Sequence, residues 1–132
     1  MTEADIVTIE KLLGTELPGS VRQFLLHPEA IPPIVRQDFF DDPRNLVSRN
    51  LELRQNGYYH LRWSKDFLAV GHDPGDCVYY FDLGDPGVSV YFADHDHDDP
   101  ADYKKLAETP RDFTAYLVNL GDDFEQQERR TR

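Results

Sequence analysis

The sequence predicts an α+β fold in which helices at both ends of the chain pack on one antiparallel sheet. Apolar residues recur at helical spacing near both termini, and short β-rich segments fill the region from Tyr58 onward. Joints rich in Pro and Gly separate these segments. The length of 132 residues fits one domain. We therefore expect a single domain over residues 1–121, followed by a polar and frayed tail over 122–132.

Two helices are expected in the first quarter of the chain. Thr2 is a suitable N-cap for the first helix, and Asp5 lies three residues further on, as in a variant of the capping box. Gly14 is a natural C-terminal stop. Leu17-Pro18 begins the second helix, because Pro fits the first turn of a helix. The apolar faces of the two helices consist of Ile6, Ile9, Leu12 and Leu13 and of Val21, Phe24 and Leu25.

The region between these helices and the β-rich segments is less regular. Residues 26–45 contain four prolines and few periodic positions, which predicts an irregular crossing loop. Four apolar side chains are expected to attach this loop to the core: Ile34, Val35, Phe39 and Phe40. Residues 46–56 fit either a short helix or a strand, and a helix from Arg49 is the favoured alternative.

Five short strands are expected next, over residues 58–63, 67–71, 77–83, 88–93 and 103–106. The joints at 72–76 and 84–87 are strong Pro/Gly turns. The strands 67–71, 77–83 and 88–93, which these turns join, form an antiparallel meander, because parallel neighbours need a crossover of a dozen or more residues. Thr109-Pro110 then opens a final helix, which Gly121 is expected to end. The buried stripe of this helix is Phe113, Tyr116, Leu117 and Leu120.

Composition excludes several classes of function. The chain has 25 acidic and 14 basic side chains and a net charge of −11, so direct binding to nucleic acid is disfavoured. No apolar run approaches the roughly 20 residues of a membrane-spanning helix. The N-terminus is acidic where a secretory signal would be basic, so export is not expected. The single cysteine, Cys77, forms no internal disulfide. Together these features predict a soluble, cytoplasmic protein.

The negative charge is concentrated in one segment. Between Lys65 and Lys104 there are ten aspartates and no basic residue, whereas the rest of the chain has 15 acidic side chains against 14 basic ones. A meander places alternate turns at opposite ends of a sheet, so the 72–76 turn and the 94–102 loop should share one end. We call this region the acidic end and define it by its aspartates: Asp73, Asp76, Asp94, Asp96, Asp98, Asp99 and Asp102. The other three aspartates are expected at the opposite end: Asp66, Asp82 and Asp85.

Two interpretations of the acidic end remain open. Aspartate is a common turn residue, so the charge can be that of ordinary solvated loops. Alternatively, the surface steers a basic partner. In that case the candidate partner-binding residues are the seven aspartates together with Tyr80 and Tyr91, which would be exposed if helices cover only one face of the sheet.

Catalytic and metal-binding motifs are weak. His95 and His97 point the same way in an extended chain and lie among carboxylates, a set that suits zinc. The string is similar to the His-x-His-x-Asp of metallo-β-lactamase-like hydrolases, but no histidine follows His97. We therefore assign no metal, cofactor or catalytic residue, and keep a hydrolase using His72, His95 and His97 as a third hypothesis. Cys77 is expected to be a buried, inert thiol in a strand. His60 in its strand and His27 at a helix end are expected to have packing roles.

Three stretches together resemble the SUKH superfamily. They are residues 9–18 continuing to Val21, Phe24 and Leu25; Val70-Gly71 with Gly75-Asp76 and Phe81-Asp82-Leu83; and Leu106-Ala107 leading to Phe113, Tyr116, Leu117 and Leu120. Departures from the family pattern are Val21, the proline-rich 26–45 stretch and the Asp/His loop. The resemblance implies an α+β domain without a known active site. Many bacterial members look like immunity proteins that bind a cognate toxin, whereas eukaryotic relatives act in the regulation of cell-wall synthesis. The expected partner is therefore a protein toxin, basic and of nuclease type, bound by a monomer or weak homodimer.

Overall fold

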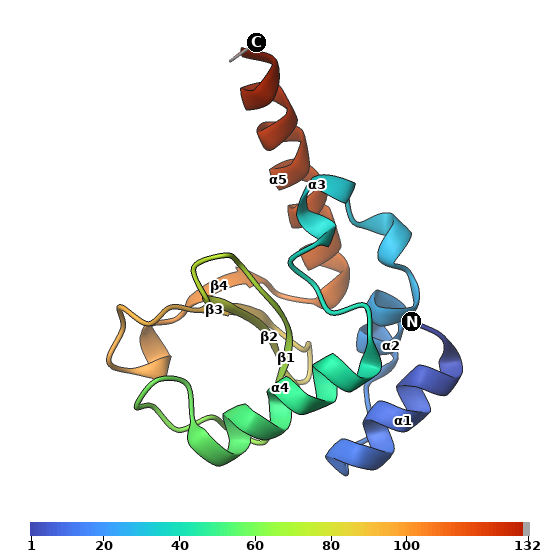
Figure 1. Cartoon of the computed structure of the whole chain (residues 1–132), viewed down its shortest axis with the longest axis vertical. Coiled ribbons are helices and arrows are strands. Elements are labelled where there is room, and N and C mark those ends of the chain that lie inside the picture. Colours follow the sequence, from blue (N-terminus) through green and yellow to red (C-terminus); the bar gives the residue numbers. More distant parts are fainter. Residues whose placement is uncertain (131–132) are drawn as a thin grey trace.

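The computed structural model describes residues 1–130 and confirms the α+β class (Figure 1). The helices are α1 (Glu3–Leu13), α2 (Gly19–Leu26), α3 (Pro33–Arg36), α4 (Pro43–Asn56) and α5 (Pro110–Arg130), with 3-10 turns at Pro28–Ala30 and Pro100–Asp102. The strands are β1 (Phe67–His72), β2 (Val78–Asp82), β3 (Val90–Ala93) and β4 (Lys104–Ala107). They form one antiparallel sheet in the order β1-β2-β3-β4, in which β1, β2 and β3 are the predicted meander and β4 is added beside β3.

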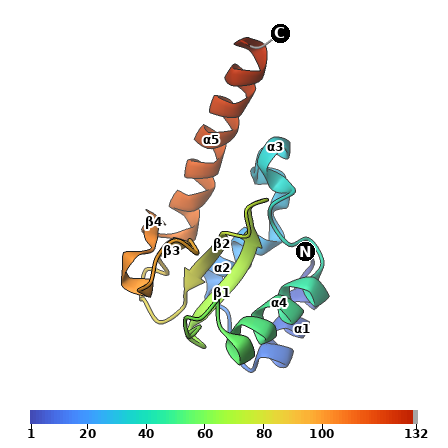
Figure 2. The same cartoon turned by 60° about the vertical axis from the view of Figure 1, so that its left-hand side comes forward.

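In the N-terminal half of the chain, the residues expected to begin and end the first helix do so. Thr2 and Asp5 form a reciprocal capping box at α1, and Gly14 ends that helix with a φ of 66°. Residues 46–56 are helical, and α4 begins earlier than expected, at Pro43, because Asp42 accepts a hydrogen bond from the Arg44 N–H at 2.9 Å and caps the helix. Figure 2 shows α1 and α4 together beside the sheet, with α2 behind β1 and β2.

The proline-rich stretch is more regular than predicted. Pro28 and Pro33 each begin a short helical segment, where the missing N–H of proline has no cost. The chain then runs along β1: the Phe40 N–H donates to the carbonyl oxygen of Val70 at 3.0 Å, and the His72 N–H donates to that of Asp38 at 2.8 Å. The expectation of a wholly irregular loop over 26–45 is therefore wrong.

Both faces of the sheet are buried. Alternate side chains of β2 enter two separate apolar clusters: Phe81 packs with Phe24 and Phe113 under the helices, whereas Tyr80 packs on the opposite face. The cover of that second face includes Tyr58, Trp63 and Tyr103. Most of the helix layer therefore covers one face. Loops and aromatic side chains cover most of the other face, together with Leu53 of α4.

Residues 58–63 were expected to form a strand, and this expectation is wrong. Tyr58 and Leu61 instead close a tight turn by exchanging two backbone hydrogen bonds of 2.8 and 3.0 Å. The backbone approaches itself closely here, since a Cβ at Gly57 would lie 2.4 Å from the carbonyl oxygen of Leu61. The 58–63 segment has the aromatic composition of a strand because its large side chains pack against the face of the sheet.

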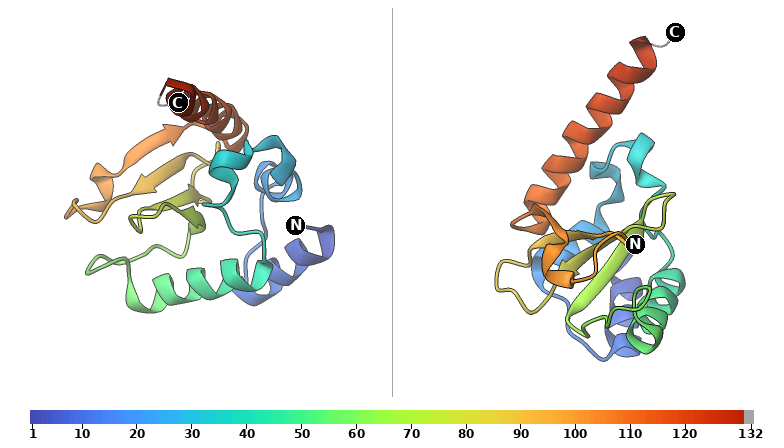
Figure 3. Two further views of the ribbon diagram at one scale, coloured as in Figure 1. Left: turned by 45° about the horizontal axis from the view of Figure 1, so that its top comes forward. Right: turned by 90° about the vertical axis from the view of Figure 1, so that its left-hand side faces the viewer.

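The last helix is longer than the sequence predicts. Thr109 caps α5 by accepting a hydrogen bond from the Asp112 N–H at 3.1 Å, as expected. The helix does not end at Gly121 but continues to Arg130 and extends beyond the rest of the chain (Figure 3). The expected frayed tail is thus helical over 122–130, and residues 131 and 132 lie outside the described residues. No helix within residues 1–130 has the length and apolar character needed to cross a membrane.

Candidate functional site: the acidic end of the sheet

Strand register brings the two aspartate-rich loops to one end of the sheet. His72 pairs with Val78 and Val78 with Ala93, so the end of β1, the start of β2 and the end of β3 are adjacent. Phe92 pairs with Lys104 at the start of β4. The 72–76 turn and the 94–102 loop therefore share this end, as the meander predicted. Asp66 and Asp82 lie together at the opposite end, where a Cβ at Gly84 would be 3.1 and 3.3 Å from their carboxylate oxygens.

Three of these aspartates also hold the loops in shape. Asp73 Oδ1 accepts hydrogen bonds from the backbone N–H groups of Gly75 and Cys77, both at 2.9 Å. In the second loop, Asp94 Oδ1 accepts from the Asp96 N–H at 2.8 Å, and Asp99 Oδ1 accepts from the Ala101 N–H at 2.9 Å. The turn interpretation therefore explains part of the aspartate content. It does not exclude binding, because these bonds fix the positions of the carboxylates.

Carboxylates of both loops affect the pKa of the Cys77 thiol. Its pKa is raised to about 11, chiefly by burial and then by the charges of Asp73 and, across the sheet, Asp94 and Asp96. Cys77 is half-buried and lies just before β2, so its expected place as a buried strand residue is wrong. At neutral pH it is a protonated thiol and a poor nucleophile.

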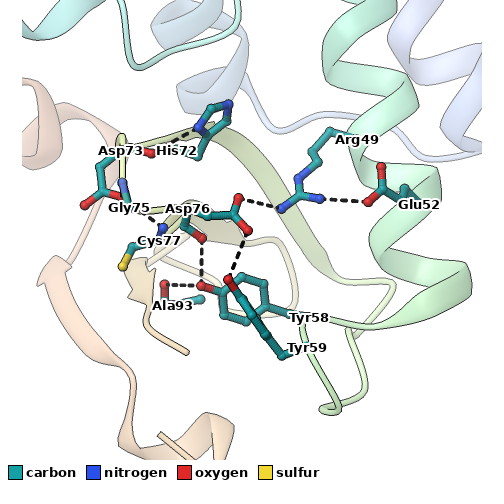
Figure 4. Close-up of polar contacts among 10 residues, drawn as sticks. All are labelled: Arg49, Glu52, Tyr58, Tyr59, His72, Asp73, Gly75, Asp76, Cys77 and Ala93. Atoms are coloured by element: carbon teal, nitrogen blue, oxygen red, sulfur yellow. Dashed lines mark hydrogen bonds and ion pairs between the residues drawn. The ribbon is translucent and has the colours of Figure 1, made fainter. Parts of the chain in front are cut away.

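Two adjacent tyrosines connect the 58–61 turn to the acidic end (Figure 4). The Tyr58 hydroxyl donates to the carbonyl oxygen of Asp76 at 2.8 Å and lies 3.3 Å from that of Ala93, so it bridges both loops. The Tyr59 hydroxyl donates to Asp76 Oδ2 at 3.4 Å, and its ring lies edge-on to His95 at a centroid distance of 5.0 Å. Tyr59 is 56% exposed and has a φ of 55°.

Sequence reasoning missed Tyr59 because it treated the aromatic residues near this position as core. The available signal was the Asn56-Gly57 pair, which favours a turn immediately before the two tyrosines. Tyr59 is thus an exposed aromatic side chain on an otherwise acidic surface.

One aspartate of the acidic end is neutralised within the chain. Arg49 on α4 lies 3.2 Å from Asp76 Oδ1 and 2.9 Å from Glu52 Oε1 (Figure 4). Within residues 1–130, no Lys or Arg forms an ion pair with the other six aspartates. Those six carboxylates are the part of the surface with unbalanced charge.

Tyr80 is not available to a partner. It is 2% exposed, and its ring lies 4.4 Å from that of Phe67 and 5.0 Å from that of Trp63. The expectation that Tyr80 is exposed is wrong because the 57–66 segment and Tyr103 cover this face of the sheet. Tyr91 is half-buried and stacks on Tyr80 at 5.5 Å.

The histidines of the hydrolase hypothesis have separate surroundings. His72 Nδ1 donates to the carbonyl oxygen of Asp73 at 3.2 Å, whereas the His97 ring lies edge-on to Tyr103. Within residues 1–130, the group of three with ligand atoms inside 4.8 Å is instead Asp94, His95 and Asp96. Exposed side chains of this kind are common without an ion, and we assign no metal to them.

The remaining two histidines also differ in their surroundings. His60 is exposed in the turn instead of lying in an apolar strand, which corrects its expected packing role, and its Nε2 lies 3.9 Å from Asp98 Oδ1. His27 caps the end of α2 and contacts Glu29 at 2.8 Å.

Comparison with known proteins identifies the family. Searches of curated proteins and of solved structures returned no match. The model of the SMI1/KNR4 family (SUKH-1) matches residues 1–116, which include the whole sheet and the acidic end but not the second half of α5. This chain therefore belongs to the SMI1/KNR4 family (SUKH-1).

Proposed function

We propose that this chain is a non-enzymatic, cytoplasmic immunity protein that binds and neutralises a cognate toxin through the acidic end. The observation that carries the proposal is the convergence of seven aspartates from two loops, six of them without a Lys or Arg ion pair within residues 1–130. Membership of the SMI1/KNR4 family fits such a role. A basic toxin of nuclease type is the partner whose charge best complements this surface.

The physics of association favours such a pairing. An acidic surface attracts the basic groups with which a nuclease binds phosphates, and steering of this kind raises association rates by roughly 10- to 1,000-fold at low salt. Asp73, Asp94 and Asp99 are held by backbone N–H groups. Less conformational entropy is therefore lost when a partner binds.

The chemistry of the surface supports binding over catalysis. The raised pKa of Cys77 keeps this thiol protonated at neutral pH, so it is unsuited to nucleophilic attack. His72 contacts a backbone carbonyl, and His97 packs on an aromatic ring. Neither contact is the nucleophile–base pair that covalent catalysis requires.

A regulatory or scaffolding role of the cell-wall regulator type is the second candidate. The part of α5 beyond residue 116 lies outside the family match, and its residues 122–130 are exposed. A projecting helix of this kind suits the assembly of other proteins. In that case the chain would have no toxin partner.

Co-expression separates these two candidates. The chain is produced with the protein encoded beside it, in a form with its activity disabled, and complexes are isolated at low and high salt. The immunity proposal predicts a salt-sensitive complex with a basic toxin domain and protection of cells that express the active toxin. Normal toxicity together with no complex would overturn the immunity proposal and favour the scaffold.

A further inference from the structure

The acidic end carries most of the histidines of the chain. Four of the five lie there: His60, His72, His95 and His97. The fifth, His27, lies at the end of α2 and contacts Glu29. Histidine is the side chain whose ordinary charge change falls between pH 5 and 8. The net charge of this surface therefore depends on pH in the range where aspartates stay ionised.

Two of these histidines face carboxylates directly. His95 Nδ1 lies 3.3 Å from Asp96 Oδ1 and 4.0 Å from Asp94 Oδ1, and the ring of Tyr59 covers one side. His60 Nε2 lies 3.9 Å from Asp98 Oδ1. A proton on either ring is thus placed beside the carboxylates that a basic partner would contact.

The other two histidines differ in accessibility. His72 is exposed, donates to the Asp73 carbonyl and lies against Phe40. Burial and the charge of Asp73 raise the pKa of Asp38, and positive charge on His72 opposes this increase. His97 is half-buried against Tyr103, and its enclosed Nδ1 has no hydrogen-bond partner among residues 1–130. His60, His72 and His95 are therefore the three accessible proton acceptors.

Four other titratable groups at this surface keep their charge over the same pH range: Arg49, Cys77, Tyr58 and Tyr59. Arg49 remains a cation. The pKa values of Cys77, Tyr58 and Tyr59 are raised, chiefly by burial, so these groups stay neutral. Among the groups at this surface, imidazole is thus the type whose ordinary change of charge falls between pH 5 and 8.

We propose that the acidic end is a pH-regulated docking surface, whose attraction for a basic protein weakens as histidines within it become protonated. The inference rests on the proposed function and adds its regulation. The seven aspartates and Arg49 together have a formal charge of −6, and this surface has −3 when His60, His72 and His95 are also protonated. Electrostatic steering falls with this charge, and binding is strongest at neutral or higher pH.

A decalysine peptide is the probe, with binding followed by fluorescence anisotropy at pH 7.5 and 5.5 and constant low ionic strength. The wild-type protein should bind about tenfold more weakly at pH 5.5. The exposed-histidine variant H60Q/H72Q/H95Q should bind nearly equally at both values. His27→Gln is the matched control and should keep the wild-type pH dependence. NMR spectra recorded at both pH values verify that each variant is folded.

Failure of this inference and failure of the proposed surface give different results. Equal wild-type binding at both pH values, or unchanged pH dependence in the triple variant, would overturn the regulation alone. A variant with asparagine at Asp94, Asp96, Asp98 and Asp99 should lose most decalysine binding at pH 7.5. If it binds like the wild type, or if the wild type does not bind, the acidic end is not a docking surface for basic partners.

Discussion

The side-chain amide of Asn50 pairs with both backbone groups of Ala69. Its Nδ2 donates to the Ala69 carbonyl oxygen at 2.9 Å, and the Ala69 N–H donates to its Oδ1 at 2.8 Å. Asn50 is fully buried on α4, and Ala69 lies in the edge strand β1. The amide thus replaces a neighbouring strand and closes part of the sheet edge.

Replacement of Asn50 by leucine should destabilise the fold strongly. The change leaves the buried N–H and carbonyl groups of Ala69 without partners, at a cost of about 2–4 kcal/mol in the free energy of unfolding. Urea denaturation measures this loss. Gln55→Leu, at an exposed position of the same helix, is the matched control and should change stability by less than about 0.5 kcal/mol. Equal effects of the two changes would contradict the pairing.

The two adjacent tyrosines should respond differently to loss of their hydroxyl groups. Tyr58→Phe removes a buried donor that bridges the carbonyl oxygens of Asp76 and Ala93, so we expect a loss of about 1–2 kcal/mol. Tyr59→Phe removes an exposed hydrogen bond of 3.4 Å and should cost under about 0.5 kcal/mol. Thermal and urea unfolding compare the pair, and a larger effect at Tyr59 would be inconsistent with the bridge.

Alkylation of Cys77 reports on the electrostatics of the acidic end in the free protein. With a pKa of about 11, roughly one thiol in a thousand is ionised at pH 8, so iodoacetamide should react slowly and about tenfold faster per added pH unit. Neutralising Asp94 and Asp96 to asparagine lowers this pKa and should accelerate the reaction at pH 8. Asp66→Asn, at the other end of the sheet, should leave the rate unchanged. An unaltered rate in the double variant would show that the 94–102 loop lies away from the thiol.

Gly121 should resist replacement despite its position inside a helix. Alanine gains about 1 kcal/mol in helix propensity, but a Cβ here would lie 2.7 Å from the ring carbon Cβ of Pro32. We expect a net loss of about 1–3 kcal/mol from overpacking. Asn119→Ala, at an exposed position of α5, should be neutral or slightly stabilising. A Gly121→Ala variant more stable than the wild type would contradict the close approach.

Local sequence signals predicted most of the architecture. The Pro/Gly joints specified hairpins, and hairpins specify both the strand order and which loops share an end. The capping residues Thr2 and Thr109 marked the starts of the first and last helices. The location of the acidic end followed from these signals because it depends only on the order of turns.

Features that depend on long-range packing were not predictable from local patterns. Gly121 resembles a helix stop, but its function is to allow contact with Pro32, 89 positions earlier in the chain. The aromatic 58–63 segment resembles a strand, yet it covers the sheet face opposite the main helix layer. The same aromatic segment buries Tyr80. The hydrogen bonding of Asn50 to Ala69 is not indicated by the sequence around either residue.

Association kinetics test the central claim most directly. A basic toxin that co-purifies with this chain is mixed by stopped flow with wild-type protein and with a D94N/D96N/D98N/D99N variant, in which asparagine can still accept the loop hydrogen bonds. A control variant, D112N/D122N/D123N/E125Q on α5, removes the same charge elsewhere. Binding through the acidic end predicts an association rate at least about tenfold lower for the first variant at low salt, and a nearly unchanged rate for the control. Equal rates for the two variants would contradict it.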